Sequence, residues 1–391
     1  MKGIILEARD TEGIIFDLGA LSERLNQLTD RRDNRGKVYP LGSLLSMILL
    51  ARLAGADKPQ GIFEWIRYRR ADFVPMFQLK RGNTPCVNTI YTILGDELLQ
   101  EELEMTLRQY LHEQYGGQSS VLVAIDGKTM RGTIPKGMTQ GVHLLTAYLA
   151  EEGVVLKQVE VLPDKNEISA APALLAGLYL KGKVVIADAL QTQRPFCMDV
   201  LRQGGQYVLW AKENQPALLA DIQQFFEPPP YVPGWHQEDW PQTTASVCTK
   251  SHGRLEKRTL SLIADLESFI SWPGIQQIFK LERLSQEMNT GRESRQTVYG
   301  LTSCPPALAD ANQLLDWTQR YWAIENGLHY RRDVTLREDA TRTTRTGVAK
   351  ALAILNNFLI SLMHKLGFNN LASARRFFDA RIAQQLFSDF Y

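Results

Sequence analysis

The chain has 391 residues, of which 44% are hydrophobic and 22% are charged. This composition is that of a folded protein with two or three domains, and it excludes a largely disordered chain. The net charge of +1 excludes a strong overall field that attracts nucleic acid, so any such binding must come from local patches. The four cysteines lie far apart with no CxxC pair, which argues against a zinc site or a disulfide framework.

Two apolar stretches are candidates for a membrane span, and neither satisfies the requirements. Residues 44–51 are too few to cross a bilayer, and the run 351–363 is interrupted by Asn356 and Asn357. The N-terminus lacks the apolar core and cleavage site of a signal peptide. We therefore expect a cytoplasmic protein.

Residues 16–111 are predicted to be helical, because apolar residues recur there at helical spacing. Between residues 67 and 81 five cations stand against one acid, a local excess of four. A basic helical segment of this kind is typical of a DNA-binding module. A solvated helix face would give the same count, so the charges alone leave both interpretations open.

After GGQSS at 116–120 the pattern changes to short apolar strands. The predicted strands are 121–126, a hairpin of 143–150 and 154–163, 184–188 and 207–211. Helices are predicted after the third strand, where Asn166 can form the N-cap, and near 194–203 and 216–226. The order β-β-β-α-β-α-β-α is that of an RNase H-like mixed five-stranded sheet flanked by helices, an α/β fold.

Two of these strands, the first and the fourth, end in aspartate, at Asp126 and Asp188. This strand order brings the two strand ends side by side. Two carboxylates so close resist ionising together unless a cation neutralises them, and oxygen ligands suit Mg²⁺ or Mn²⁺. In the simpler alternative, each aspartate only caps the turn that follows it.

A third carboxylate is expected on the helix that follows a β-rich insertion at 227–312. Glu325, His329 and Arg332 are spaced to share one helical face. Asp333, Glu338 and Asp339 compete with Glu325, which we prefer because its stretch shows the most regular helical pattern. Trp322, three residues before it, is expected in the core. The predicted domains are therefore 1–115 (helical, DNA-binding), 116–226 (first part of the core), 227–312 (insertion) and 313–391 (last core helix and C-terminal helices).

Six segments in this order resemble the bacterial insertion-sequence transposases of the DDE superfamily, in the branch containing the H-repeat-associated proteins. The segments are AIDGKTMRGT, DKNEISAAPALLAGL, VVIADALQTQ, YVLWAKENQPAL, SHGRLEKR and WAIENGLHYRRDVTLREDATR. The resemblance implies an RNase H-like core whose catalytic, metal-binding triad is Asp126, Asp188 and Glu325. It further implies two Mg²⁺ ions (Mn²⁺ is an alternative), cleavage at transposon ends and strand transfer to target DNA.

The implied partner is double-stranded DNA, bound by a homodimer because transposition holds two ends together. Candidate DNA contacts are Lys128, Arg131, Lys212, Asn214, His252, Arg254, His329 and Arg332. Asn214 and Gln215 could instead cap the next helix. Related enzymes carry Arg four residues before the glutamate and Lys seven after it, where this chain has Tyr321 and Arg332. A domesticated nuclease without strand transfer and a catalytically silent DNA-binding protein are the alternatives.

Overall fold

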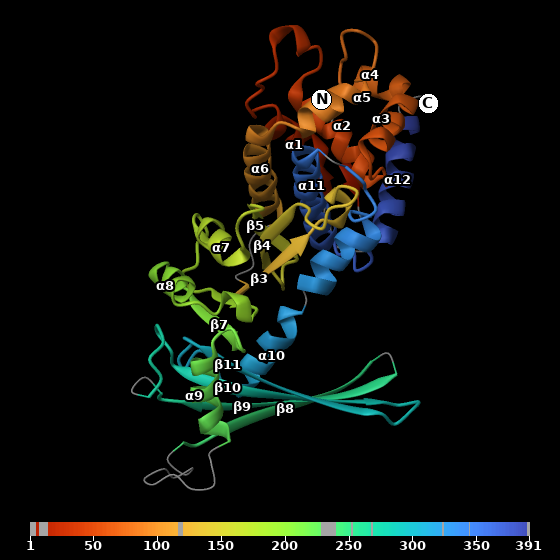
Figure 1. The fold of residues 1–391 in the computed structure, drawn as a ribbon. Helices are drawn as coiled ribbons and strands as arrows, with labels where there is room; N and C mark the ends of the chain where they lie inside the picture. The colour runs from red at the N-terminus through yellow and green to blue at the C-terminus, as the bar shows by residue number, and fades with distance from the viewer. Residues whose placement is uncertain are drawn as a thin grey trace.

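The computed structural model describes residues 5–7, 15–115, 120–227, 240–251, 253–266, 269–322, 324–343 and 345–388. These residues form a mixed α/β fold around one large sheet, whose central strands are flanked by helices (Figure 1). Helices from the two ends of the chain lie together at one end of the molecule, and a long β-stranded extension projects at the other (Figure 1).

The N-terminal segment is helical, as predicted, apart from a small hairpin of β1 (Ile5–Glu7) and β2 (Ile15–Asp17). Its helices are α1 (Leu18–Leu25), α2 (Leu41–Leu53), α3 (Pro59–Tyr68), α4 (Arg70–Met76), α5 (Val87–Leu94) and α6 (Glu97–Tyr115). They share one hydrophobic core with the C-terminal helices α11 (Thr346–Lys365) and α12 (Leu371–Ser388). Helix α11 is long and apolar enough to cross a membrane, but 83% of its most apolar window is buried inside the fold.

The large sheet has nine strands among the described residues, in the order β5-β4-β3-β6-β7-β11-β10-β9-β8. The strands are β3 (Leu122–Thr129), β4 (His143–Leu149), β5 (Val154–Val161), β6 (Val184–Ala187), β7 (Gln206–Ala211), β8 (Thr243–Ser251), β9 (Arg254–Ala264), β10 (Gln277–Glu287) and β11 (Glu293–Thr302).

The predicted pairing of the first five of these strands is confirmed, while the predicted size of the sheet is wrong. Strands β3, β4 and β5 pair antiparallel, and β6 and β7 continue the sheet in parallel from β3. The four strands of the segment 227–312 then extend the sheet, because β11 pairs antiparallel with β7. Strand alternation in a sequence shows which residues share a face but does not identify the neighbouring strand, so this junction was not foreseen.

Strand β3 is covered on both faces, as its continuous apolar run predicted. Val123 and Ile125 are buried against the core that contains α7 (Glu167–Leu175), α8 (Arg194–Arg202) and α9 (Pro216–Phe226). Leu122 and Ala124 are buried in the core shared with the terminal helices and α10 (Ala311–Tyr321). Asp126, which follows this apolar run within β3, therefore lies at the edge of two hydrophobic layers.

Local signals in the sequence set several element boundaries. Asn166 caps α7, accepting a hydrogen bond from the Ser169 N–H, in a reciprocal capping box with the Ser169 side chain. The turn at Asn289–Arg292 joins β10 to β11 as a hairpin, with Gly291 at φ +69°, a conformation that favours glycine. All four cysteines are free.

Candidate active site

The three predicted carboxylates line one cavity of about 260 Å³. Asp126 lies on β3, and Asp188 directly follows β6, its parallel neighbour, in which Ala187 is paired with Ile125. Glu325 comes from the segment after α10, a helix that contacts β6. The predicted end of the first strand at Asp126 is wrong, because β3 continues to Thr129 in its pairing with β4. The parallel pairing of β3 with β6 does stop just before the two aspartates, at Ile125 and Ala187, and all three acids line the same cavity.

The helix that carries Glu325 is not the regular α-helix that the sequence pattern predicted. Helix α10 ends at Tyr321, and Glu325–His329 and Arg331–Thr335 form two successive π-helical turns. Such wide turns are rare and occur often at functional sites. The prediction that Glu325, His329 and Arg332 share one helical face assumed 3.6 residues per turn. The π turns have a different spacing, so that assumption does not hold here.

The acids in the cavity oppose one another's ionisation. Burial raises the pKa of Asp126 to about 7, with further contributions from the charges of Glu167, Asp188 and Glu325. Burial and Glu167 also raise the pKa of Asp188, against the opposing effects of the Leu190 N–H and Lys212. Asp188 also caps the following turn, so the simple capping role and a role in the acidic centre coexist.

The donor set fits a hard divalent cation. Carboxylate oxygens are the ligands that Mg²⁺ and Mn²⁺ prefer, and a cation would relieve the repulsion that raises these pKa values. Within the described residues no three His, Cys, Asp or Glu side chains lie close enough together to form a preassembled metal site. Asp126, Asp188 and Glu325 are the side chains in the cavity that could hold the ion.

Three cations line the same cavity as the acids. Lys212 follows β7, and Arg258 and Arg283 come from β9 and β10 of the sheet extension. Both arginines contact Glu256, with Nε-to-oxygen distances of 2.5 and 2.7 Å. Neither arginine was predicted as a site residue, because nothing in a strand pattern shows that a side chain lines this cavity.

Trp322 also lines this cavity, and 47% of its surface is exposed. The prediction that it belongs to the core is wrong. Helix α10 ends one residue earlier, so the apolar stripe of that helix, which includes the buried Leu314 and Tyr321, does not continue through Trp322.

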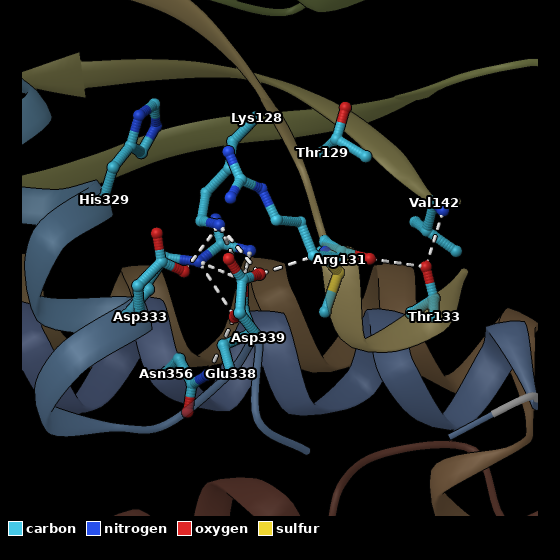
Figure 2. A network of polar contacts seen from close by, with 12 residues as sticks. Lys128, Thr129, Arg131, Thr133, Val142, His329, Asp333, Glu338, Asp339 and Asn356 are labelled. Carbon is cyan, nitrogen blue, oxygen red and sulfur yellow. Dashed lines mark hydrogen bonds and ion pairs between the residues drawn. The ribbon is translucent and has the colours of Figure 1, made fainter. Parts of the chain in front are cut away.

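Lys128 lies in a buried network of polar contacts with Asp333, Glu338 and Asp339 (Figure 2), which Arg332 joins through Glu338. Lys128 Nζ lies 2.6 Å from Asp333 and 3.4 Å from Asp339. Arg332 is fully buried, and its Nε donates to both oxygens of Glu338 at 3.0 and 2.9 Å. These placements argue against the predicted phosphate contacts of Lys128 and Arg332, because neither cation faces an open surface.

The acids of this network competed with Glu325 in the sequence. Glu338 is buried, and its charge is stabilised: burial raises its pKa, but Arg332 and Lys128 reverse the effect and leave the pKa below its ordinary value. Asp333 and Asp339 are bound to Lys128. Each of the three acids is thus paired with a protein cation, Asp333 and Asp339 sharing Lys128, which distinguishes them from Glu325 in the cavity.

His329 lies near Lys128 (Figure 2), and its Nδ1 is 3.4 Å from Oδ2 of Asp126. Burial, together with the nearby charges of Arg332 and Lys128, lowers its pKa to about 3. The imidazole is therefore neutral at physiological pH, and the contact with Asp126 is not an ion pair.

The other predicted DNA contacts lie in three different settings. Asn214 and Gln215 donate to Ala189 and Thr192 carbonyls, at 2.6 and 3.0 Å, and so brace the loop that follows Asp188. The side chain of Arg131 is exposed, while its backbone N–H donates to Asp339. Arg254 is exposed at the far end of the sheet extension, 3.2 Å from Glu287. His252 lies outside the described residues.

A fourth carboxylate close to the cavity, Glu167, was missed. It lies in the segment DKNEISAAPALLAGL, where it was passed over as the first residue of a capped helix. Its effect on the pKa values of both Asp126 and Asp188 places it electrostatically near them. An acid beside an N-cap has an ordinary structural role, so no separate signal in the sequence pointed to Glu167.

Comparison with known proteins identifies the family. Residues 117–363 match the family described as Transposase DDE domain, and residues 22–111 match the family described as DDE_Tnp_1-associated. The chain is 28% identical over 358 residues to "Putative transposase YncI" of Escherichia coli O157:H7, covering 89% of this chain and 88% of that one. It is 24% identical over 356 residues to "H repeat-associated putative transposase YhhI" of Escherichia coli K12, covering 89% and 91%.

A solved structure, the piggyBac transposase synaptic complex with hairpin DNA, aligns with 95% of this chain and 78% of that one. Its TM-score of 0.43 at 11% identity is too low to establish a common fold. The sequence comparisons are sufficient without it. The match over 117–363 and the match of the preceding helical segment show that this chain belongs to the Transposase DDE domain family, which confirms the resemblance seen in its six motifs and supports a transposase function.

Proposed function

We propose that this protein catalyses phosphoryl transfer on DNA, cleaving at transposon ends and joining the freed 3′ end to target DNA. The observation that carries the proposal is the single cavity lined by Asp126, Asp188 and Glu325. Family membership supports the transposase assignment. The five strands β5-β4-β3-β6-β7, in that order, support an RNase H-like catalytic core.

The three carboxylates would hold two Mg²⁺ ions, with Mn²⁺ as an alternative. Bound divalent ions would supply activation of the attacking oxygen and stabilisation of the leaving one. The chain's own contribution is positional: β3 and β6 fix the two aspartates on neighbouring strands, and the π turn presents Glu325 to them. Buried hydrophobic layers beneath β3 limit the movement of Asp126.

The three cations that line the cavity would position the DNA backbone. Lys212, Arg258 and Arg283 share the cavity with the carboxylates, and phosphate contacts of this kind orient DNA without reading its sequence. Exposed Arg131 and Arg254 stay as further candidates, at a distance from the cavity. The helical segment 1–115, with its excess of cations between 67 and 81, is the candidate for recognition of the transposon end.

We further propose that two copies of the chain act together in the cytoplasm on paired DNA ends. Sizing of the protein on a DNA fragment with two ends tests this, and one copy on paired ends would contradict it.

The chemistry is tested with labelled transposon-end DNA and Mg²⁺ or Mn²⁺. Wild type should nick the end and, given target DNA, produce joined products, while Asp188→Ala should do neither. Cleavage by Asp188→Ala at the wild-type rate would refute the assigned site. Nicking without joined products would favour the nuclease alternative, and DNA binding without nicking would favour the silent one.

A further inference from the structure

Glu167 is a charged side chain beside the cavity that the proposed mechanism does not use. It is the first residue of α7, and only 19% of its side chain is exposed. Helix α7 contacts both β4 and the turn Ala189–Gln191 that follows Asp188. Helix α7 therefore packs against the strand that pairs with Asp126 and against the turn that follows Asp188.

The position of the Glu167 carboxylate is fixed by a chain of contacts on the strands. His143 on β4 lies directly opposite Thr129 on β3, and Thr129 Oγ1 is 2.7 Å from His143 Nδ1. The other ring nitrogen, Nε2, is 2.8 Å from Glu167 Oε1. The imidazole is thus oriented by one contact and holds the carboxylate with the other, an arrangement common around metal sites.

The carboxylate also lies against the backbone next to Asp126. A Cβ atom added at Gly127 would be 2.1 Å from Glu167 Oε1 and 2.8 Å from His143 Nε2. Only glycine leaves room for a carboxylate there. In agreement with this geometry, the charge of Glu167 raises the pKa of both aspartates and of the cavity residue Tyr321.

A second, independent feature indicates that something polar belongs beside these acids. Thr146 lies directly opposite Asp126 in the β3–β4 pair, so the two side chains share one face of the sheet. Thr146 is completely buried, and its hydroxyl has no hydrogen-bond partner among the described residues. A buried hydroxyl without a partner is unfavourable, and a hydrated cation on the Asp126 carboxylate would supply one.

We propose that Glu167 is a fourth carboxylate of the divalent-cation centre formed by Asp126, Asp188 and Glu325, and that His143 holds it in position. The inference rests on the proposed function, because it adds a residue to the same centre. Glu167 reaches the centre from the α7 side of the sheet, and Asp126 from the side of the terminal helices. Acids from both sides would surround the ion with negative charge.

The test measures Mn²⁺ binding to the full-length protein without DNA, by titration calorimetry, for folded variants matched by circular dichroism. We expect Glu167→Gln to weaken Mn²⁺ binding about tenfold or more and Glu167→Asp to restore part of it. His143→Ala should weaken binding, and His143→Gln, which keeps a donor, should weaken it less. Glu160→Gln is the matched control, because Glu160 is similarly exposed but pairs with Lys350.

Cleavage of end DNA is measured in parallel, so that the two proposals can fail separately. If Glu167→Gln binds Mn²⁺ as tightly as wild type, the inference is wrong, even where wild type cuts DNA and Asp126→Asn does not. If Glu167→Gln loosens Mn²⁺ but wild type never cuts DNA, the inference stands and the proposed function fails. Wild-type protein that binds no Mn²⁺ would overturn both.

Discussion

Arg332 and Glu338 form a buried ion pair, with 2.8 Å between Nη2 and Oε1. Asn356 of α11 donates to the other oxygen, Oε2, at 2.9 Å, and itself accepts a hydrogen bond from Arg52 of α2. The pair therefore connects the π-helical turns that follow Glu325 with helices from both ends of the chain. Its role is to hold the Glu325 segment on the helical core.

We predict that Arg332→Ala lowers the free energy of unfolding by about 3 kcal/mol, because it leaves the Glu338 carboxylate buried without its cation. Urea denaturation measures the change. Arg254→Ala is the control: the pair of Arg254 with Glu287 is exposed, and its loss should cost about 0.5 kcal/mol or less. Unchanged stability together with weaker DNA binding would instead restore the role of Arg332 as a phosphate contact.

Gly132 supports the same network from the motif MRGT. A Cβ atom there would be 2.5 Å from the Thr341 carbonyl oxygen and 2.9 Å from that of Glu338. Because both are backbone atoms, Gly132→Ala should destabilise the protein by about 2 kcal/mol. Gly61→Ala is the matched control, since it is in helix α3 with a nearest neighbour at 4.0 Å and should be neutral or stabilising. Equal melting temperatures for the two variants would show that the loop at 338–341 moves without cost.

The parts of the fold that the sequence predicted are those set by neighbouring residues. Strand β3, the β4–β5 hairpin and the cap at Asn166 each follow from a short run of side chains. Because β3 and β6 are both apolar and both end near an aspartate, the meeting of Asp126 and Asp188 could also be predicted. The nine-stranded sheet could not, because the pairing of β7 with β11 joins residues about 90 positions apart.

The site was less predictable where burial decides a side chain's role. Lys128 and Arg332 have the sequence context of DNA contacts, yet a turn at 336–338 brings Glu338 back onto Arg332. Arg337 in that turn has φ +53°, a conformation that is uncommon for residues other than glycine and that its side chain does not indicate. The π turns at Glu325 were missed for a similar reason, because sequence periodicity assumes a regular helix.

Lys212 and Asn214 follow the same strand and should differ in what their loss affects. Lys212 lines the cavity, so Lys212→Ala should weaken DNA binding and reduce the salt dependence of binding by about one phosphate contact. Asn214 braces the loop after Asp188, so Asn214→Ala should lower the turnover number about tenfold with little change in DNA affinity. Affinity and single-turnover cleavage are measured for both. A loss of affinity in Asn214→Ala matching that of Lys212→Ala would show that Asn214 contacts DNA.

Glu104 on α6 should make stability depend on pH. Burial raises its pKa to about 7, against the opposing effects of Arg108 and a hydrogen bond from the Gln158 backbone, and Oε1 has no partner among the described residues. Since the unfolded carboxyl loses its proton at lower pH, folding takes up a proton between about pH 4.5 and 7, and stability falls as the pH rises through this range.

Glu104→Gln should therefore stabilise the protein by about 2 kcal/mol at pH 8, with the gain disappearing near pH 4.5. Thermal denaturation across this range measures it, with exposed Glu23→Gln on α1 as control, because Glu23 does not contribute to the shift of the Glu104 pKa. A gain in Glu104→Gln that is equal at all pH values, or equal to that of the control, would show that the Glu104 carboxyl titrates as it does in the unfolded chain.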